Sequence, residues 1–210
     1  MTEALLLHEA DVDRVRELAS IGAGHAANAL ASLTGRTCEM RVPTVRLLSA
    51  QRVEAAAEGP DERDMTGVFF EVEGGLGGVL ALLLPAASCE RLLAHLLGGA
   101  GHDRSDPASQ SALREVGNIL ASHAANAVGE MLGVTMLPSI PRLALEDATG
   151  ALARLLARRA PHPPELRVET EICDRARELC GILVFAPDRL QEPGTVRARH
   201  GFPYRGGELS

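Results

Sequence analysis

The chain has 210 residues and a formal net charge of −7 at pH 7, and all 21 of its formal cations are arginines. This acidic balance argues against nucleic acid and against a basic membrane surface as the partner, because both need clustered cations. The absence of lysine from the sequence excludes Schiff-base and P-loop lysine chemistry.

Composition and the N-terminal sequence suggest the class of protein. Apolar residues make up 46% of the chain and aromatic residues 2%, so we expect a core of Leu, Val, Ile and Ala in one fairly large domain or two small ones. No segment approaches the roughly 20 apolar residues of a membrane span, and the N-terminus lacks a basic n-region. These features predict a soluble cytoplasmic protein.

The first half of the chain begins with a helical segment, ELASIGAGHAANALASLTG, at residues 17–35. Ala and Leu dominate it, no proline interrupts it, and Gly35 stands where a C-cap glycine belongs. Residues 37–48 then resemble a strand, in which Pro43 indicates an edge or a bend. The remaining predicted elements of this half are a hairpin of strands 66–73 and 77–84 around Gly74-Gly75, and a helix from Pro85 to Gly98.

The second half repeats the first. Residues 115–133 read EVGNILASHAANAVGEMLG and align with residues 17–35 without a gap, with HAANA identical in both. The register extends outwards, because Arg16 matches Arg114 and Pro43 matches Pro141, so we interpret the halves as an internal duplication. The predicted elements here are a helix over 115–133 preceded by a start signal at 105–107, a strand-like stretch over 134–145, a short helix over 151–159, strands 166–172 and 180–185, and a helix cut short after Pro187.

These elements predict an α/β fold of the α+β type. Each repeat, a helix with three strands, is too small to bury its own sheet, so we expect a pseudo-two-fold pair that shares one mostly antiparallel sheet with helices packed on it. A single duplicated domain should span residues 1–192, with repeat one at about 10–100 and repeat two at about 105–192. Residues 193–210 are rich in Gly, Pro and Arg and should form a flexible tail.

A polar face stands out on the second repeated helix. Ser111, Glu115 and Asn118 are spaced i, i+4 and i+7, which places them on one side of a helix. The amide can orient a water molecule, and the carboxylate can pair with a cation on a partner. A solvated helix face would look the same, but the polar face recurs in the first repeat. The expected buried stripe is Leu113, Val116, Leu120 and Ala124.

The spacing matches a known pattern, (Asp or Ser)-x3-Glu-x2-Asn-x22-Pro, and so the chain resembles the CheC, CheX and FliY group of chemotaxis phosphatases. The sequence segment LREVGNIL, which contains Glu115 and Asn118, is similar to LREIGNI of that group. The second-copy motif fits completely and consists of Ser111, Glu115, Asn118 and Pro141. The first-copy motif consists of Asp13, Glu17, Ser20 and Pro43, with serine in place of asparagine.

The resemblance implies a phosphatase that hydrolyses the phosphoaspartate of a CheY-like response regulator in chemotaxis signalling. Glu115 would dock on a lysine of the receiver, and Asn118 would position the attacking water. Ser111 and Pro141 would shape the site. The protein would need no cofactor of its own and no metal site, because the receiver supplies Mg²⁺. Within the first-copy motif, Ser20 predicts weak or absent catalysis with binding retained.

An alternative interpretation is a non-catalytic regulatory adaptor that binds the phosphorylated receiver, a CheD-type receptor deamidase, or both. Asn118 is the discriminating residue, because a pure binding module has no need of an amide beside Glu115. Receivers outside chemotaxis also remain open as substrates.

We expect the histidines and cysteines to have structural roles and not chemical ones. His25 and His123 lie at equivalent positions of HAANA, but neither has a spaced partner that would make a metal site. The four cysteines include no CxxC pair, and we expect free thiols. They are Cys38, Cys89, Cys173 and Cys180.

Overall fold

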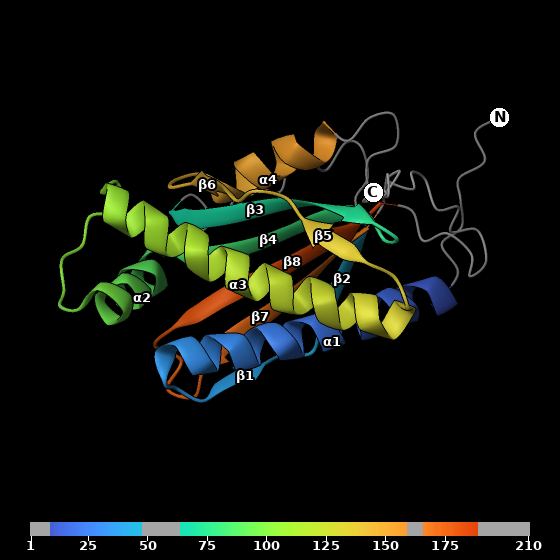
Figure 1. Cartoon of the computed structure of the whole chain (residues 1–210), viewed down its shortest axis with the longest axis horizontal. Coiled ribbons are helices and arrows are strands. Elements are labelled where there is room, and N and C mark those ends of the chain that lie inside the picture. Colours follow the sequence, from blue (N-terminus) through green and yellow to red (C-terminus); the bar gives the residue numbers. More distant parts are fainter. Residues whose placement is uncertain (1–8, 48–63, 159–165, 189–210) are drawn as a thin grey trace, which may run out of the picture.

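The computed structural model describes residues 9–47, 64–158 and 166–188 (Figure 1). The first repeat contains α1 (Glu9–Thr34), β1 (Cys38–Met40), β2 (Thr44–Leu47), β3 (Met65–Gly74), β4 (Gly78–Pro85) and α2 (Ala86–Leu97). The second contains α3 (Pro107–Leu132), β5 (Met136–Pro138), β6 (Arg142–Ala144), α4 (Ala148–Ala157), β7 (Leu166–Asp174) and β8 (Cys180–Pro187). The helix expected after Pro187 and the expected tail lie outside the described residues. Among the helices of the described ranges, none is long and apolar enough to cross a bilayer.

The eight strands of the described ranges form one sheet in the order β1-β7-β8-β4-β3-β5, with β2 also on β7 and β6 also on β3. Every strand pair in it is antiparallel. The order is symmetric about the pair β8 and β4, and each repeat adds its short edge strands to the hairpin of the other. This confirms the predicted duplicated fold with a shared sheet.

Helices cover both faces of the sheet. In Figure 1, α1 and α3 lie antiparallel to each other along one face, α4 lies on the other, and α2 lies at one end. The central strand β4 is therefore buried on both sides, which explains its continuous apolar run GVLALLLP. Its side chains facing α1 or α3 are Leu80, Leu82 and Leu84, and those packed with α4 are Val79, Ala81 and Leu83.

The ends of α3 follow the predicted signals. Asp106 is the N-cap and Pro107 the first helical residue, a position at which the missing N–H costs nothing. Gly133 ends the helix with φ of 65°, and its N–H donates to the carbonyl of Glu130 at 3.2 Å. The expected buried stripe is confirmed, since Leu113, Val116, Leu120 and Ala124 are all buried. The inner face of α3 is thereby fixed on the sheet.

The two strand-like stretches each divide at the matched proline. Residues 37–48 give β1 and β2, and residues 134–145 give β5 and β6. Pro43 and Pro141 lie in the two intervening bends, as their fixed φ and missing N–H favour. Each bend turns towards the helix that precedes it, because α1 contacts both β1 and β2, and α3 contacts both β5 and β6.

The prediction of four free thiols is wrong for one pair. A disulfide joins Cys173 of β7 to Cys180 of β8. The two residues are seven positions apart in sequence but directly opposite in the β7–β8 hairpin, so strand register brings them together. Cys38 and Cys89 are free, and burial raises the pKa of both thiols.

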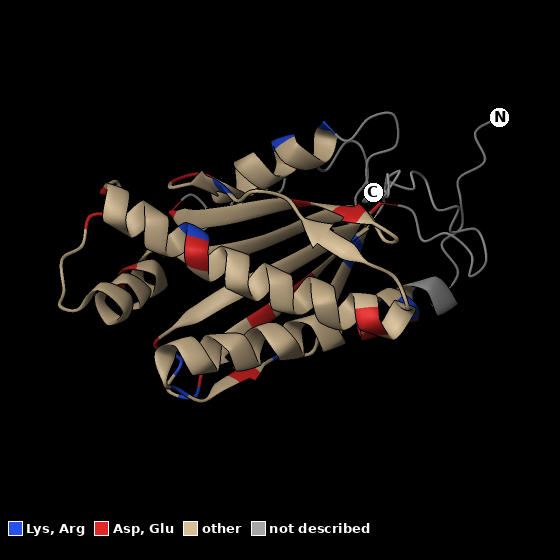
Figure 2. Ribbon diagram, in the orientation of Figure 1, with Lys and Arg blue, Asp and Glu red and all other residues tan. Residues whose placement is uncertain are grey.

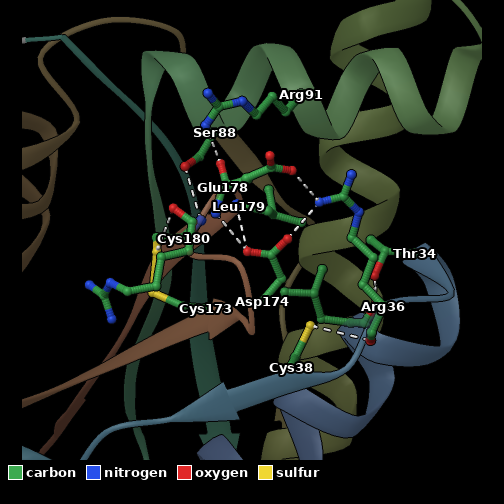
Figure 3. Close-up of polar contacts among 12 residues, drawn as sticks. Thr34, Arg36, Cys38, Ser88, Arg91, Cys173, Asp174, Glu178, Leu179 and Cys180 are labelled. Atoms are coloured by element: carbon green, nitrogen blue, oxygen red, sulfur yellow. Dashed lines mark hydrogen bonds and ion pairs between the residues drawn. A yellow bond between two sulfur atoms is a disulfide. The ribbon is translucent and has the colours of Figure 1, made fainter.

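The turn beyond that disulfide is organised by Asp174 (Figure 3). One carboxylate oxygen accepts hydrogen bonds from the N–H groups of Glu178 at 2.7 Å and Leu179 at 3.0 Å, and the other accepts from Arg36 at 2.5 Å. Burial alone would raise the pKa of the Asp174 carboxyl, but these hydrogen bonds outweigh it and lower the pKa. The stabilisation is therefore present at neutral pH and is lost only as the pH falls through the lowered pKa.

Candidate active site

The outer face of α3 presents three of the four second-copy residues. Ser111, Glu115 and Asn118 are all exposed. Together with half-buried Pro141 they line a hollow of about 420 Å³. The structure thus brings the four second-copy residues together around one open space.

The rest of the hollow is lined by residues to which the sequence analysis gave no role. They are Arg114 of α3, and Pro138, Ser139 and Ile140 at the β5–β6 bend. Arg114 donates a hydrogen bond to the side-chain oxygen of Gln110 at 3.1 Å, one turn back along the helix. Sequence signals could have found two of these residues: Arg114 matches Arg16, and Ile140 is the apolar residue directly before a matched proline, as Val42 is in the first repeat.

Charge on α3 is confined to three of its 26 residues: Arg114, Glu115 and Glu130. Figure 2 accordingly shows one charged band in the first half of the helix and a further acidic patch near its end. Within the described ranges, no hydrogen bond or ion pair engages the side chains of Glu115 and Asn118. Both are therefore available to a partner that docks over the hollow.

A glycine beside the amide sets the distance between helix and sheet. Gly117 is buried, and a Cβ at this position would lie 2.6 Å from Cγ1 and 2.9 Å from Cβ of Val68 on β3. Such distances are far inside van der Waals contact, so α3 approaches β3 this closely only because residue 117 has no side chain. The position of Asn118 relative to the β5–β6 bend depends on that approach.

The first-copy motif is arranged similarly but differs in chemistry. Asp13 and Glu17 are exposed on α1, Ser20 is half-buried, and Pro43 is buried between β1 and β2. Arg16 forms an ion pair with Asp13 at 2.5 Å.

The corresponding pair cannot form in the second copy. Ser111 occupies the position that matches Asp13, and Arg114 is held by Gln110 instead. Because α1 and α3 are antiparallel and each motif lies in the first half of its helix, the two motifs lie towards opposite ends of the helix pair (Figure 1).

This fold and this site define a duplicated α+β protein with a carboxylate and an amide displayed on one helix, and the comparisons with known proteins agree. The CheC-like family model matches residues 13–47 and 109–144, which hold the two motif copies. The chain is 34% identical over 150 residues to the CheY-P phosphatase CheC of Bacillus subtilis (strain 168), covering 70% of this chain and 71% of that protein. The chain belongs to the CheC-like family, as its motifs predicted.

Solved structures share the fold. FliY of Thermotoga maritima superposes with a TM-score of 0.61 at 25% sequence identity, covering 87% of this chain and 92% of that chain. A chain from the CheX-CheY-BeF3-Mg+2 complex of Borrelia burgdorferi superposes with a TM-score of 0.55 at 14% identity, covering 81% and 97%. At that identity the second likeness is evidence for the fold alone.

Proposed function

We propose that this chain hydrolyses the phosphoaspartate of a CheY-like receiver protein at the second-copy motif. The observation that carries the proposal is the exposed pair Glu115 and Asn118, which share one helix face at the rim of a hollow and have no partner within the described residues. The name of the Bacillus subtilis relative, a CheY-P phosphatase, supports the reaction class. The same name supports a CheY-like receiver as the partner, and a chain of this fold occurs in a complex with CheY.

The proposed reaction is an in-line displacement at phosphorus. The oxygen of a water molecule attacks the phosphorus, the bond from phosphorus to the aspartyl oxygen breaks, and inorganic phosphate and the receiver carboxylate are released. Asn118 accepts a hydrogen bond from this water through its amide oxygen, and its NH₂ group can donate to a phosphoryl oxygen. Phosphoryl transfer depends on positioning and charge neutralisation more than on covalent chemistry, so one well-placed amide is a sufficient contribution.

Glu115 supplies the docking charge in this proposal. Its carboxylate lies one turn before Asn118 and pairs with a lysine beside the receiver's phosphoaspartate. The cations of the reaction come from the receiver, which brings that lysine and its own Mg²⁺.

The test compares steady-state dephosphorylation of a phosphorylated CheY-type receiver by the wild type and by Asn118→Ala. We expect the variant to lose kcat by roughly 100-fold, the usual effect of removing one positioned polar group from a transition state. The matched control is Asn126→Ala, because Asn126 is also exposed on α3 but lies about 12 Å further along the helix.

Either outcome of this comparison is informative. Loss of kcat in Asn118→Ala alone supports catalysis by the second-copy motif. A wild type that binds the phosphorylated receiver without shortening its lifetime would contradict the proposal and favour the regulatory adaptor.

A further inference from the structure

The β5–β6 bend displays a large apolar side chain to solvent. Ile140 is 87% exposed, the highest value among the five exposed large apolar residues of the described ranges. A single exposed apolar residue needs no explanation, but this one has a counterpart. Val42, also β-branched, is 81% exposed at the matched position of the first repeat, and each residue directly precedes a motif proline.

Equivalent backbone hydrogen bonds hold the two bends. The N–H of Ser139 donates to the carbonyl of Glu71 on β3 at 2.8 Å, and the N–H of Arg41 donates to the carbonyl of Glu171 on β7 at 2.8 Å. The second-copy bend has one more hydrogen bond to β3, since the N–H of Glu71 donates to the Ser139 hydroxyl at 3.0 Å. Ile140 therefore projects from a fixed backbone, and burying it against a partner costs little additional ordering of the chain.

Ile140 lines the same hollow as Glu115 and Asn118. A protein that covers those two polar groups must also cover Ile140, so its apolar surface leaves water only if the partner offers an apolar patch at that point. A free small molecule bound in the hollow would leave much of so exposed a side chain in water. The position of Ile140 thus favours a protein surface as its partner.

We propose that Ile140 is a docking residue for the receiver and packs against apolar surface beside its phosphoaspartate. The proposal rests on the proposed function and assigns a contact to the same site. Ile140 adds apolar contact on one side of the docked receiver while Glu115 pairs with charge on the other, and both contribute to the affinity of the complex in which Asn118 acts. Because Ile140 contributes to binding in the ground state and the transition state alike, its loss raises KM and leaves kcat unchanged.

The experiment is steady-state dephosphorylation of a phosphorylated CheY-type receiver by the full chain. Ile140→Ser should raise KM roughly ten-fold with kcat unchanged, and Ile140→Leu should restore a KM near that of the wild type. The control is Met131→Gln, which removes another exposed apolar side chain, 46% exposed, near the end of α3. An unchanged KM in Ile140→Ser, or a fall in kcat alone, would overturn the proposal.

Two further measurements separate this inference from the proposed function. If the wild type does not accelerate decay of the receiver, the proposed function fails, and affinity for the beryllofluoride-activated receiver decides the docking role. Binding about ten-fold weaker in Ile140→Ser supports that role, and equal affinity overturns it. A change in oligomeric state by light scattering, with KM unaltered, would instead assign Ile140 to a contact between copies of this chain.

Discussion

One side chain accounts for most of the chemical difference between the two motif copies. Glu17 matches Glu115, and the two prolines match, but Ser20 stands where Asn118 supplies an amide. A hydroxyl is shorter than the amide by about one bond and cannot donate and accept at the same separation. Ser20 is also half-buried, whereas Asn118 is exposed.

The first copy should therefore regain activity when the amide is supplied. We expect Ser20→Asn in the Asn118→Ala background to restore part of the lost receiver dephosphorylation, measured as the decay of the phosphorylated receiver. Restoration should be partial, because the ion pair between Arg16 and Asp13 has no equivalent in the second copy. Ser32→Asn, at an exposed position further along α1, is the control. A double variant as inactive as Asn118→Ala itself would show that more than the amide separates the copies.

The close approach of α3 to β3 makes one glycine critical. In Gly117→Ala the new methyl group meets Val68, which is fully buried and cannot move aside. Overpacking of this kind costs about 1–3 kcal/mol, which exceeds the gain of about 1 kcal/mol in helix propensity. We expect a lower free energy of unfolding in urea and reduced phosphatase activity, because Asn118 moves with the helix.

The matched control is a helical glycine with room for a methyl group. At Gly24 of α1, the nearest atom to an added Cβ is the Met40 sulfur at 3.9 Å. Gly24→Ala should therefore raise the free energy of unfolding by up to about 1 kcal/mol. If Gly117→Ala proved as stable as Gly24→Ala, the assigned role of Gly117 would be wrong.

The sequence predicted the features that depend on neighbouring residues and missed those that depend on how strands pair. The helices, the hairpin and the shared face of Ser111, Glu115 and Asn118 depend on spacing within one segment, so periodicity was enough to predict them. Ser139 and Ile140 line the hollow because β5 and β6 pair with β3, and this pairing is set by contacts between segments that are distant in the sequence. The disulfide was missed for a different reason: its two cysteines are only seven residues apart, but the register of the β7–β8 hairpin, which their spacing does not reveal, places them opposite each other.

The duplication ties the two halves into one sheet. The short strands of each repeat pair with the hairpin of the other, and β4 pairs with β8 at the centre. Neither half can therefore complete its own sheet or cover the apolar surface of its central strand. The stability of the fold therefore depends on this exchange of strands between the repeats.

Separated halves should accordingly fail to fold alone. We expect a fragment of residues 1–104 to show no cooperative thermal transition by circular dichroism, and an equimolar mixture with residues 105–210 to regain one. The intact chain is the control. A fragment that unfolded cooperatively by itself would mean that the exchange of strands is not needed for the stability of a repeat.

On the scale of the whole molecule, we propose that this duplicated protein dephosphorylates a receiver through one amide, that of Asn118. The most direct test is single-turnover decay of a phosphorylated CheY-type receiver with the protein in large excess, so that binding is complete and only the chemical step is observed. We expect rapid decay with the wild type and decay near the receiver's own rate with Asn118→Ala, although both bind the receiver. Equal decay with the two proteins would contradict it.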